Sequence, residues 1–145
     1  MIIQNFYYTS SPLQHQLQSF YQADILLTPH GAGTTNCIFM LPHSVVIEVM
    51  PPHFSELPLA GVILHARLHY IYVSNFDYSV LAAYRLPSPD DAYKRGEYLK
   101  MRGHYKSLDL TNNPFSITSA VDDAIAFLDH TRYKIVNDYL SPIFI

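Results

Sequence analysis

The sequence predicts an α/β fold in which a mostly parallel sheet is covered by helices on both faces. Short apolar runs at 24–28, 45–49 and 70–73 have the length of strands, and stretches with helical spacing separate them. The middle run, Val45-Val46-Ile47-Glu48-Val49, is apolar at successive positions, which is typical of a parallel strand buried on both faces. Strands that alternate with helices form right-handed crossovers, and such crossovers produce a parallel sheet.

Length and composition indicate a globular domain that is large enough to bury a core. The 145 residues are 49% hydrophobic and 14% charged, and the net charge is −3. This charge gives no electrostatic reason to expect nucleic acid or an anionic membrane surface as a partner. The single cysteine, Cys37, excludes an internal disulfide, and no apolar run approaches the about 18 residues of a membrane span. Because residues 1–6 lack the features of a secretory signal, we expect residues 1–145 to be either a partial chain or a lone domain whose partner domain is elsewhere.

The first elements are a helix and a strand. Ser11-Pro12 is typical of an N-cap followed by the first residue of a helix, and we place that helix over 12–22. The strand at 24–28 follows directly. Residues 2–7, before the helix, are either a short strand or a frayed end.

A turn, a short helix and two further strands come next. Pro29 ends the first strand, and the two glycines that follow predict a sharp turn, because glycine has no Cβ to clash. The short helix predicted over about 34–41 ends before Pro42, since proline cannot continue a helix. Beyond the middle strand, apolar residues at helical spacing predict a helix over 55–68, and the strand at 70–73 follows it.

The alternation of strand-length apolar runs and helical spacing becomes less regular in the second half of the chain. Prolines, glycines and scattered aromatic residues over about 75–115 predict an irregular excursion, with a short helix near 91–101. A loop of that length inside a compact domain is usually functional or disordered. Order resumes at Ser119, which we interpret as the N-cap of a last helix from about 120 to 139.

The turn after the first strand has the features of a phosphate-binding site. Gly31 and Gly33 let backbone N–H groups approach a ligand closely, and the helix that starts at about Thr34 points its unpaired N–H groups there. Glu48 stands near the end of the middle strand, and in a parallel sheet that strand end shares one edge with the turn. A carboxylate there can accept hydrogen bonds from ribose hydroxyls. Its separation from Gly31 is close to the roughly 20 residues expected between a phosphate turn and a ribose-binding acid.

An ordered set of motifs surrounds this turn. The motifs are Ala23-Asp24-Ile25-Leu26-Leu27, His30-Gly31-Ala32-Gly33, Thr35-Asn36, Phe39-Met40, Pro42 and Val46-Ile47-Glu48. Together they resemble the C-terminal, donor-binding part of glycosyltransferase family 61. That family includes EGF-domain O-GlcNAc transferases, protein O-mannose β-1,4-N-acetylglucosaminyltransferases and plant β-1,2-xylosyltransferases. The resemblance extends over about residues 13–73, roughly half of the chain.

The resemblance implies an architecture and an activity. The architecture is a Rossmann-like three-layer sandwich, equivalent to the C-terminal half of a GT-B glycosyltransferase whose N-terminal lobe is missing here. The activity is transfer of a sugar of the GlcNAc or xylose class from a UDP-linked donor to a protein or glycan acceptor, with inversion. The nucleotide sugar is a substrate, so no cofactor and no metal is required. The usual location of the family is the lumen of the endoplasmic reticulum or Golgi, although this sequence carries no targeting signal.

The resemblance also implies roles for individual residues. The donor diphosphate would be lined by His30, Gly31, Ala32, Gly33, Thr34, Thr35 and Asn36. Glu48 would bind the ribose, and His30 is a candidate catalytic base because histidine can take up a proton near neutral pH. A cation often assists the diphosphate, and Arg67 and Arg85 are the nearest candidates along the sequence. The family commonly has a bulky residue at the position of Thr34 and a glycine at the position of His43.

Other interpretations stay open for the same residues. The glycine turn could be a purely structural turn, and Glu48 could form a structural salt bridge instead of binding ribose. His65 and His69 could share a metal, although surface or packing roles are favoured because no third ligand is evident. The chain could be a non-catalytic nucleotide-binding module or an inactive glycosyltransferase fragment. It could also be a nucleotide- or dinucleotide-dependent enzyme with a similar turn, which is less favoured because Gly-x-Gly-x-x-Gly is incomplete.

Overall fold

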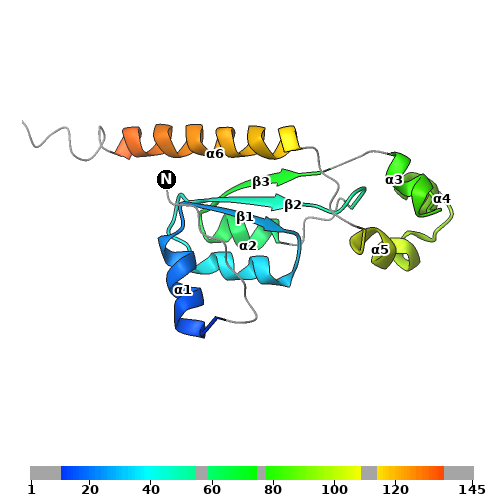
Figure 1. Ribbon diagram of the computed structural model, residues 1–145, viewed down its shortest axis with the longest axis horizontal. Helices are drawn as coiled ribbons and strands as arrows, with labels where there is room; N and C mark the ends of the chain where they lie inside the picture. The colour runs from blue at the N-terminus through cyan, green and yellow to red at the C-terminus, as the bar shows by residue number, and fades with distance from the viewer. Residues whose placement is uncertain (1–10, 55–58, 75–77, 109–113, 136–145) are drawn as a thin grey trace, which may run out of the picture.

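A three-stranded parallel sheet forms the centre of the structure, a computed structural model that describes residues 11–54, 59–74, 78–108 and 114–135. The strands lie in the order β1-β2-β3 (Figure 1). Their bounds are Ile25–Pro29 for β1, Val45–Val49 for β2 and His69–Val73 for β3. Each strand lies within one residue of its predicted position. The predicted α/β class with a parallel sheet is therefore confirmed.

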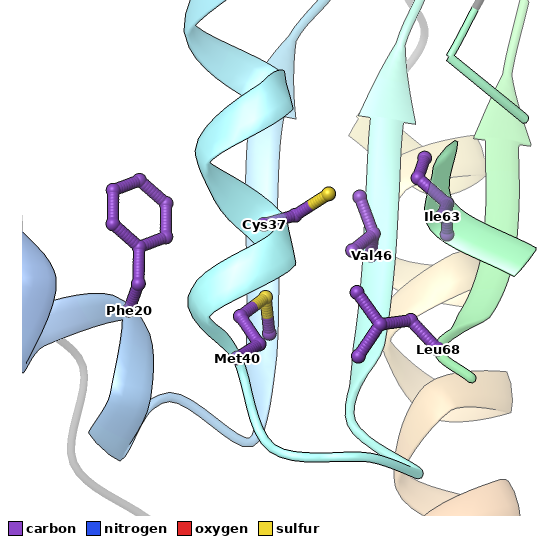
Figure 2. Close-up of a cluster of buried hydrophobic side chains, with 6 residues drawn as sticks. All are labelled: Phe20, Cys37, Met40, Val46, Ile63 and Leu68. Carbon is purple, nitrogen blue, oxygen red and sulfur yellow. The ribbon is translucent and has the colours of Figure 1, made fainter. Parts of the chain in front are cut away.

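One face of the sheet is covered by α1 (Leu13–Gln22), the 3-10 helix η1 (Ala32–Phe39) and α2 (Ala60–His65) (Figure 1). These elements and β2 contribute side chains to one buried apolar cluster (Figure 2). The cluster consists of Phe20, Cys37, Met40, Val46, Ile63 and Leu68. A fully buried aliphatic or aromatic side chain contributes about 1.5–3 kcal/mol, so this cluster holds the helices against the sheet.

The opposite face of the sheet is covered by the long helix α6 (Pro114–Ile135) (Figure 1). Its side chains pack against β2 and β3 in a second buried cluster. That cluster consists of Val45, Ile47, Val73, Ala120, Ala124 and Leu128. Alternate residues of β2 thus face opposite helical layers, which explains why the strand is apolar at successive positions. The prediction of helices on both faces is confirmed.

Three short helices lie beyond the carboxyl ends of the strands: α3 (Tyr78–Ala83), α4 (Pro89–Lys94) and α5 (Tyr98–Lys106) (Figure 1). Helices α3 and α5 share a third buried cluster with the segment that follows β2, and α4 packs against α5. The cluster consists of Met50, Phe54, Leu81, Tyr105 and Leu108. The prediction of an irregular excursion is therefore wrong over α3, α4 and α5, because Met50 and Phe54 give α3 and α5 an apolar surface to pack on and α4 packs on α5.

Two helix boundaries differ from the prediction. Pro12 takes the N-cap position of α1 and the helix begins one residue later, without a side-chain cap. Ser119 lies inside α6, which begins at Pro114, a residue whose fixed φ suits the first position of a helix. The predicted N-cap role of Ser119 is therefore wrong.

The remaining helices also differ in extent. The element predicted at 34–41 is a 3-10 helix that begins at Ala32. The single helix predicted near 91–101 is two helices, separated at Gly96, where φ is +69°. The predicted strand at 2–7 and the first residues of the helix predicted at 55–68 lie outside the described residues. Within the part of the chain that is described, no helix is both long enough and apolar enough to cross a membrane.

The turn between η1 and β2 holds His43 in a left-handed conformation, with φ of +70°. That conformation costs a residue with a Cβ about 1–2 kcal/mol, whereas glycine adopts it freely. Glycine also loses more entropy on folding, by about 0.4–1 kcal/mol. We therefore expect His43→Gly to leave the free energy of unfolding unchanged or raise it by up to about 1 kcal/mol, and His43→Val to lower it by about 1–2 kcal/mol. Urea unfolding measures both free energies. Equal stability of the two variants would show that the left-handed conformation at position 43 is not strained.

Candidate functional site

The glycine turn lies beside the carboxyl end of β2. The backbone N–H of His30 donates to the carbonyl oxygen of Val49 at 2.8 Å, which continues the parallel ladder one residue past the end of β1. In the same register Thr28 lies beside Glu48. The structure therefore brings the turn and the strand-borne acid to one edge of the sheet, as the parallel topology predicts.

Glu48 is completely buried and both of its carboxylate oxygens are hydrogen-bonded. Oε1 lies 2.8 Å from Nδ1 of His30, and Oε2 accepts from the hydroxyl of Tyr70 at 2.6 Å. Because a carboxylate only accepts hydrogen bonds, Nδ1 of His30 carries a proton in this pair. A buried carboxylate is costly unless it is paired and hydrogen-bonded, and His30 and Tyr70 meet that requirement.

The buried carboxylate also changes the acidity of its neighbours. Burial, together with the hydrogen bond to Glu48, raises the pKa of Tyr70 well above its ordinary value, so this hydroxyl remains a donor throughout the neutral range. Burial and the charge of Glu48 raise the pKa of the Cys37 thiol to about 11. Cys37 is fully buried and protonated near neutral pH, which agrees with a packing role.

The imidazole ring of His30 is held on two sides. Its side chain is 4% exposed, and its ring lies 5.0 Å from the ring of Phe54, which is fully buried. With Nδ1 bonded to Glu48, Nε2 is the ring nitrogen left for a proton or a ligand. The structure fixes the orientation of His30, and its role as a catalytic base stays a prediction.

The backbone conformation at position 31 does not require a glycine. Its φ of 168° is extended, and a Cβ added there would meet no atom within 4 Å. The sharp turn predicted from the two glycines therefore does not explain this glycine. The position instead faces open space next to the start of η1, where a side chain would obstruct an approaching ligand.

The remaining residues of the turn form the first turn of η1. The N–H of Thr34 donates to the carbonyl oxygen of Gly31 at 3.1 Å, and the hydroxyl of Thr35 donates to that of Ala32 at 2.6 Å. The first N–H groups of a helix have no partner within that helix. The amides of Ala32 and Gly33 precede the bonded amide of Thr34, so they are the donors that an anion at this end of η1 would meet.

Three predicted site residues differ in exposure. Thr34 is buried, and its hydroxyl donates to the carbonyl oxygen of Pro29 at 3.4 Å. Thr35 is exposed and Asn36 is half-buried. Thr34 therefore contributes mainly to the local packing of the turn, whereas the other two are accessible from the solvent side.

Of the two predicted cations, Arg67 lies at the other end of the strands from the turn, and Arg85 lies after α3. The carbonyl oxygen of Arg67 accepts from the N–H of His43 at 2.9 Å, at the amino end of β3 and so at the opposite edge of the sheet. Arg67 is therefore excluded as the cation of a site at the turn. Arg85 is exposed and follows α3.

His65 and His69 lie on opposite sides of the sheet. Nδ1 of His65 lies 2.7 Å from the carbonyl oxygen of Gly61 on α2. The ring of His69 stacks on Phe127 of α6 with a centroid distance of 4.0 Å. The two rings do not converge, and among the described residues no group of three or more potential ligands is arranged to hold a metal ion.

Sequence reasoning missed Tyr70 and Phe54 as neighbours of the site. Tyr70 shares a sheet face with Glu48, because even-numbered positions of β2 and β3 point to the same side in the observed register. That alternation was the available signal. Phe54 gave no signal, since it follows the sheet in an irregular segment and meets His30 only through the tertiary fold.

A shallow groove of about 640 Å³ lies between η1 and α2. It is lined by Ile38, Gly61, Val62, His65 and Ala66. None of the predicted site residues lines this groove. The candidate site is therefore placed at the carboxyl edge of the sheet by the convergence of the glycine turn and Glu48, and not by this groove.

Comparison with known proteins gives one finding that bears on this edge. No curated protein and no solved structure matches the chain. One family model does match, and the matched segment contains β1, the whole turn from His30 to Asn36 and most of β2. It ends one residue before Glu48. Residues 2–47, about a third of the chain, match the family model Glycosyltransferase 61, which confirms the resemblance that the motifs of the turn predict.

Proposed function

We propose that this chain is the donor-binding, Rossmann-like lobe of a glycosyltransferase and that it binds a UDP-sugar at the carboxyl edge of its sheet. The convergence of the turn and Glu48 carries the proposal, since His30 bonds to β2 through both its backbone N–H and its ring. Ligands of open α/β sheets bind at this edge. The match over residues 2–47 supports a glycosyltransferase in particular.

The diphosphate of the donor would lie at the start of η1. The amides of Ala32 and Gly33 and the positive end of the helix favour an anion there, and the open space at Gly31 leaves room for it. Charge develops on the nucleoside diphosphate as the glycosidic bond breaks. Fixed N–H donors aimed at that group stabilise the transition state, so the reaction needs no metal at this position.

The ribose of the donor would bind Glu48 by displacing a hydrogen-bond partner that the carboxylate already has. Both carboxylate oxygens are already bonded, so a ribose hydroxyl would replace the hydroxyl of Tyr70 as the donor to Oε2. One hydroxyl then substitutes for another and the carboxylate keeps two partners. The pair between Glu48 and His30 is unchanged by this exchange.

The remaining parts of the proposed reaction rest on the resemblance to glycosyltransferase family 61. Sugar of the GlcNAc or xylose class would pass to a protein or glycan acceptor with inversion, and His30 is the candidate base on this lobe. The carboxyl edge of the sheet is where the second lobe of a GT-B enzyme would close over the donor. The proposed location is the lumen of the endoplasmic reticulum or Golgi.

Gly31→Ala tests the diphosphate site with little disturbance of the fold. The new Cβ meets no protein atom, so we expect an unchanged thermal midpoint. We expect affinity for UDP to fall about tenfold or more, because a methyl group would separate the phosphate from the amides at the start of η1. Gly61→Ala on α2 is the matched control, since a Cβ there also meets nothing and Gly61 lines the groove between η1 and α2. Equal UDP affinity of Gly31→Ala and wild type would contradict a phosphate at this turn.

The choice of ligand separates the proposed function from its alternatives. Isothermal titration with UDP, GDP and NAD tests the nucleotide, and incubation with UDP-GlcNAc or UDP-xylose and an acceptor peptide tests transfer. UDP binding with sugar transfer supports the enzyme, whereas UDP binding without transfer favours the non-catalytic module. Preference for NAD would favour a dinucleotide-dependent protein instead.

A further inference from the structure

Positive charge is concentrated beside the candidate site. Of the nine Lys and Arg residues in the chain, six lie between 85 and 106, where three acidic residues lie. These six are Arg85, Lys94, Arg95, Lys100, Arg102 and Lys106. The rest of the sequence holds nine acidic residues and three Lys or Arg residues. Helices α3, α4 and α5 therefore bring most of the positive charge to the carboxyl ends of the strands (Figure 1).

Arg102 differs from the other five cations of this segment. It is half-buried, whereas they are exposed. Its guanidinium carbon Cζ lies 5.9 Å from the centroid of the Phe54 ring, a cation–π contact. The ring of Phe54 lies in turn 5.0 Å from the ring of His30. One aromatic side chain therefore separates Arg102 from the first residue of the glycine turn.

Helix α5 is held firmly at this position. Tyr105, three residues after Arg102, is fully buried and its hydroxyl donates to the carbonyl oxygen of Pro87 at 2.9 Å. The ring of Tyr105 also stacks on that of Tyr98, at a centroid distance of 6.0 Å. The helix therefore holds the backbone of Arg102 in place, and the contact with Phe54 restrains its side chain, so less freedom is lost when the guanidinium binds a ligand.

We propose that Arg102 of α5 binds the diphosphate of the nucleotide sugar, an inference that rests on the proposed function of the turn. A guanidinium is planar and can bind two phosphate oxygens at once, which a single ammonium does less well. It would neutralise charge on the departing nucleoside diphosphate together with the amides of η1. This assignment replaces Arg67, which lies at the opposite edge of the sheet.

The test compares Arg102→Met with Lys100→Met, which removes an exposed charge from the same helix. NMR titration of each full chain with UDP and with uridine measures affinity with and without the diphosphate. We expect Arg102→Met to weaken UDP binding about tenfold or more, since a charge-assisted hydrogen bond is lost. Uridine binding should stay within about twofold, and Lys100→Met should bind both ligands as the wild type does. Arg102→Lys should recover part of the loss.

The possible outcomes distinguish a failure of this inference from a failure of the proposed function on which it rests. UDP binding that is unchanged in Arg102→Met overturns the role of Arg102 and leaves the turn as the phosphate site. Equal losses for UDP and uridine also overturn it, because they indicate a structural role. A wild-type chain that binds no UDP overturns the proposed function, and the inference fails with it.

Discussion

Glu48→Ala is expected to lower the free energy of unfolding by about 3–5 kcal/mol, because removal of one partner leaves the others of a buried charged network unsatisfied. Glu48 has no exposed surface, and both His30 and Tyr70 bond to its carboxylate. The expected loss is a large part of the about 5–15 kcal/mol that stabilises a typical domain. Urea unfolding monitored by circular dichroism measures it. A loss below about 1 kcal/mol, the range of exposed pairs, would show that the network does not stabilise the fold.

Two tyrosines on β3 provide a matched pair of controls for this network. Tyr70→Phe removes one hydrogen bond to a charged group and is expected to cost about 1.5–3 kcal/mol. Tyr72→Phe, two residues along the same strand and exposed, is expected to change stability by less than about 0.5 kcal/mol. If Glu48→Ala does not fold, Glu48→Gln keeps the side-chain volume and one acceptor oxygen, and its coupling to Tyr70→Phe can be measured in a double-mutant cycle.

The network also has a pH signature. The pKa of Tyr70 is raised in the folded protein above its ordinary value of about 10, so the folded state holds this proton more tightly than the unfolded state. The resulting stabilisation is complete below pH 10 and is lost as the pH rises further. Tyr70→Phe lacks this titration, and its stability relative to the wild type should therefore improve between about pH 9 and about pH 11.

Phe54→Ala is expected to cost about 3–5 kcal/mol, the usual range for truncation of a buried aromatic side chain. Phe54 is fully buried, packs on the ring of His30 and lies under the guanidinium of Arg102. It joins the sheet to the cluster that holds α3 and α5. We therefore expect the loss to be local: amide hydrogen exchange should accelerate in α5 far more than in β2, and affinity for UDP should fall as well.

Two further variants make that expectation specific. Phe54→Leu keeps most of the buried volume and is expected to cost less than about 1.5 kcal/mol. Phe127→Ala removes a ring from α6, which stacks on His69 on the other face of the sheet. It should accelerate exchange in α6 and leave α5 unchanged. Faster exchange in α5 and α6 alike after Phe54→Ala would contradict a separate role for this cluster.

The sequence predicted the sheet well because its strands are governed by a local pattern. The runs predicted at 24–28, 45–49 and 70–73 match β1, β2 and β3 to within one residue. Apolar residues at successive positions require burial on both faces, and an alternation with helices provides it. The shared edge of the turn and Glu48 followed from the same reasoning, since the geometry of parallel strands fixes it.

The three short helices between residues 78 and 106 were predicted poorly because their stability is not local. Isolated helices of six to nine residues, such as α3, α4 and α5, are too short to be stable alone. Helices α3 and α5 form because Met50 and Phe54, more than 20 residues earlier in the chain, offer an apolar surface, and α4 packs on α5. Nothing in the spacing of residues 75–115 reveals that surface.

The sequence by itself determined the parallel sheet, the position of the glycine turn and the presence of an acid at the same edge, because each depends on local pattern and strand direction. Only the tertiary structure decided what surrounds that acid. It paired Glu48 with His30 and Tyr70, placed Arg67 at the far edge and brought Arg102 near the turn through Phe54. Contacts between distant segments depend on how three layers pack around one sheet, and no local pattern in the sequence encodes that packing.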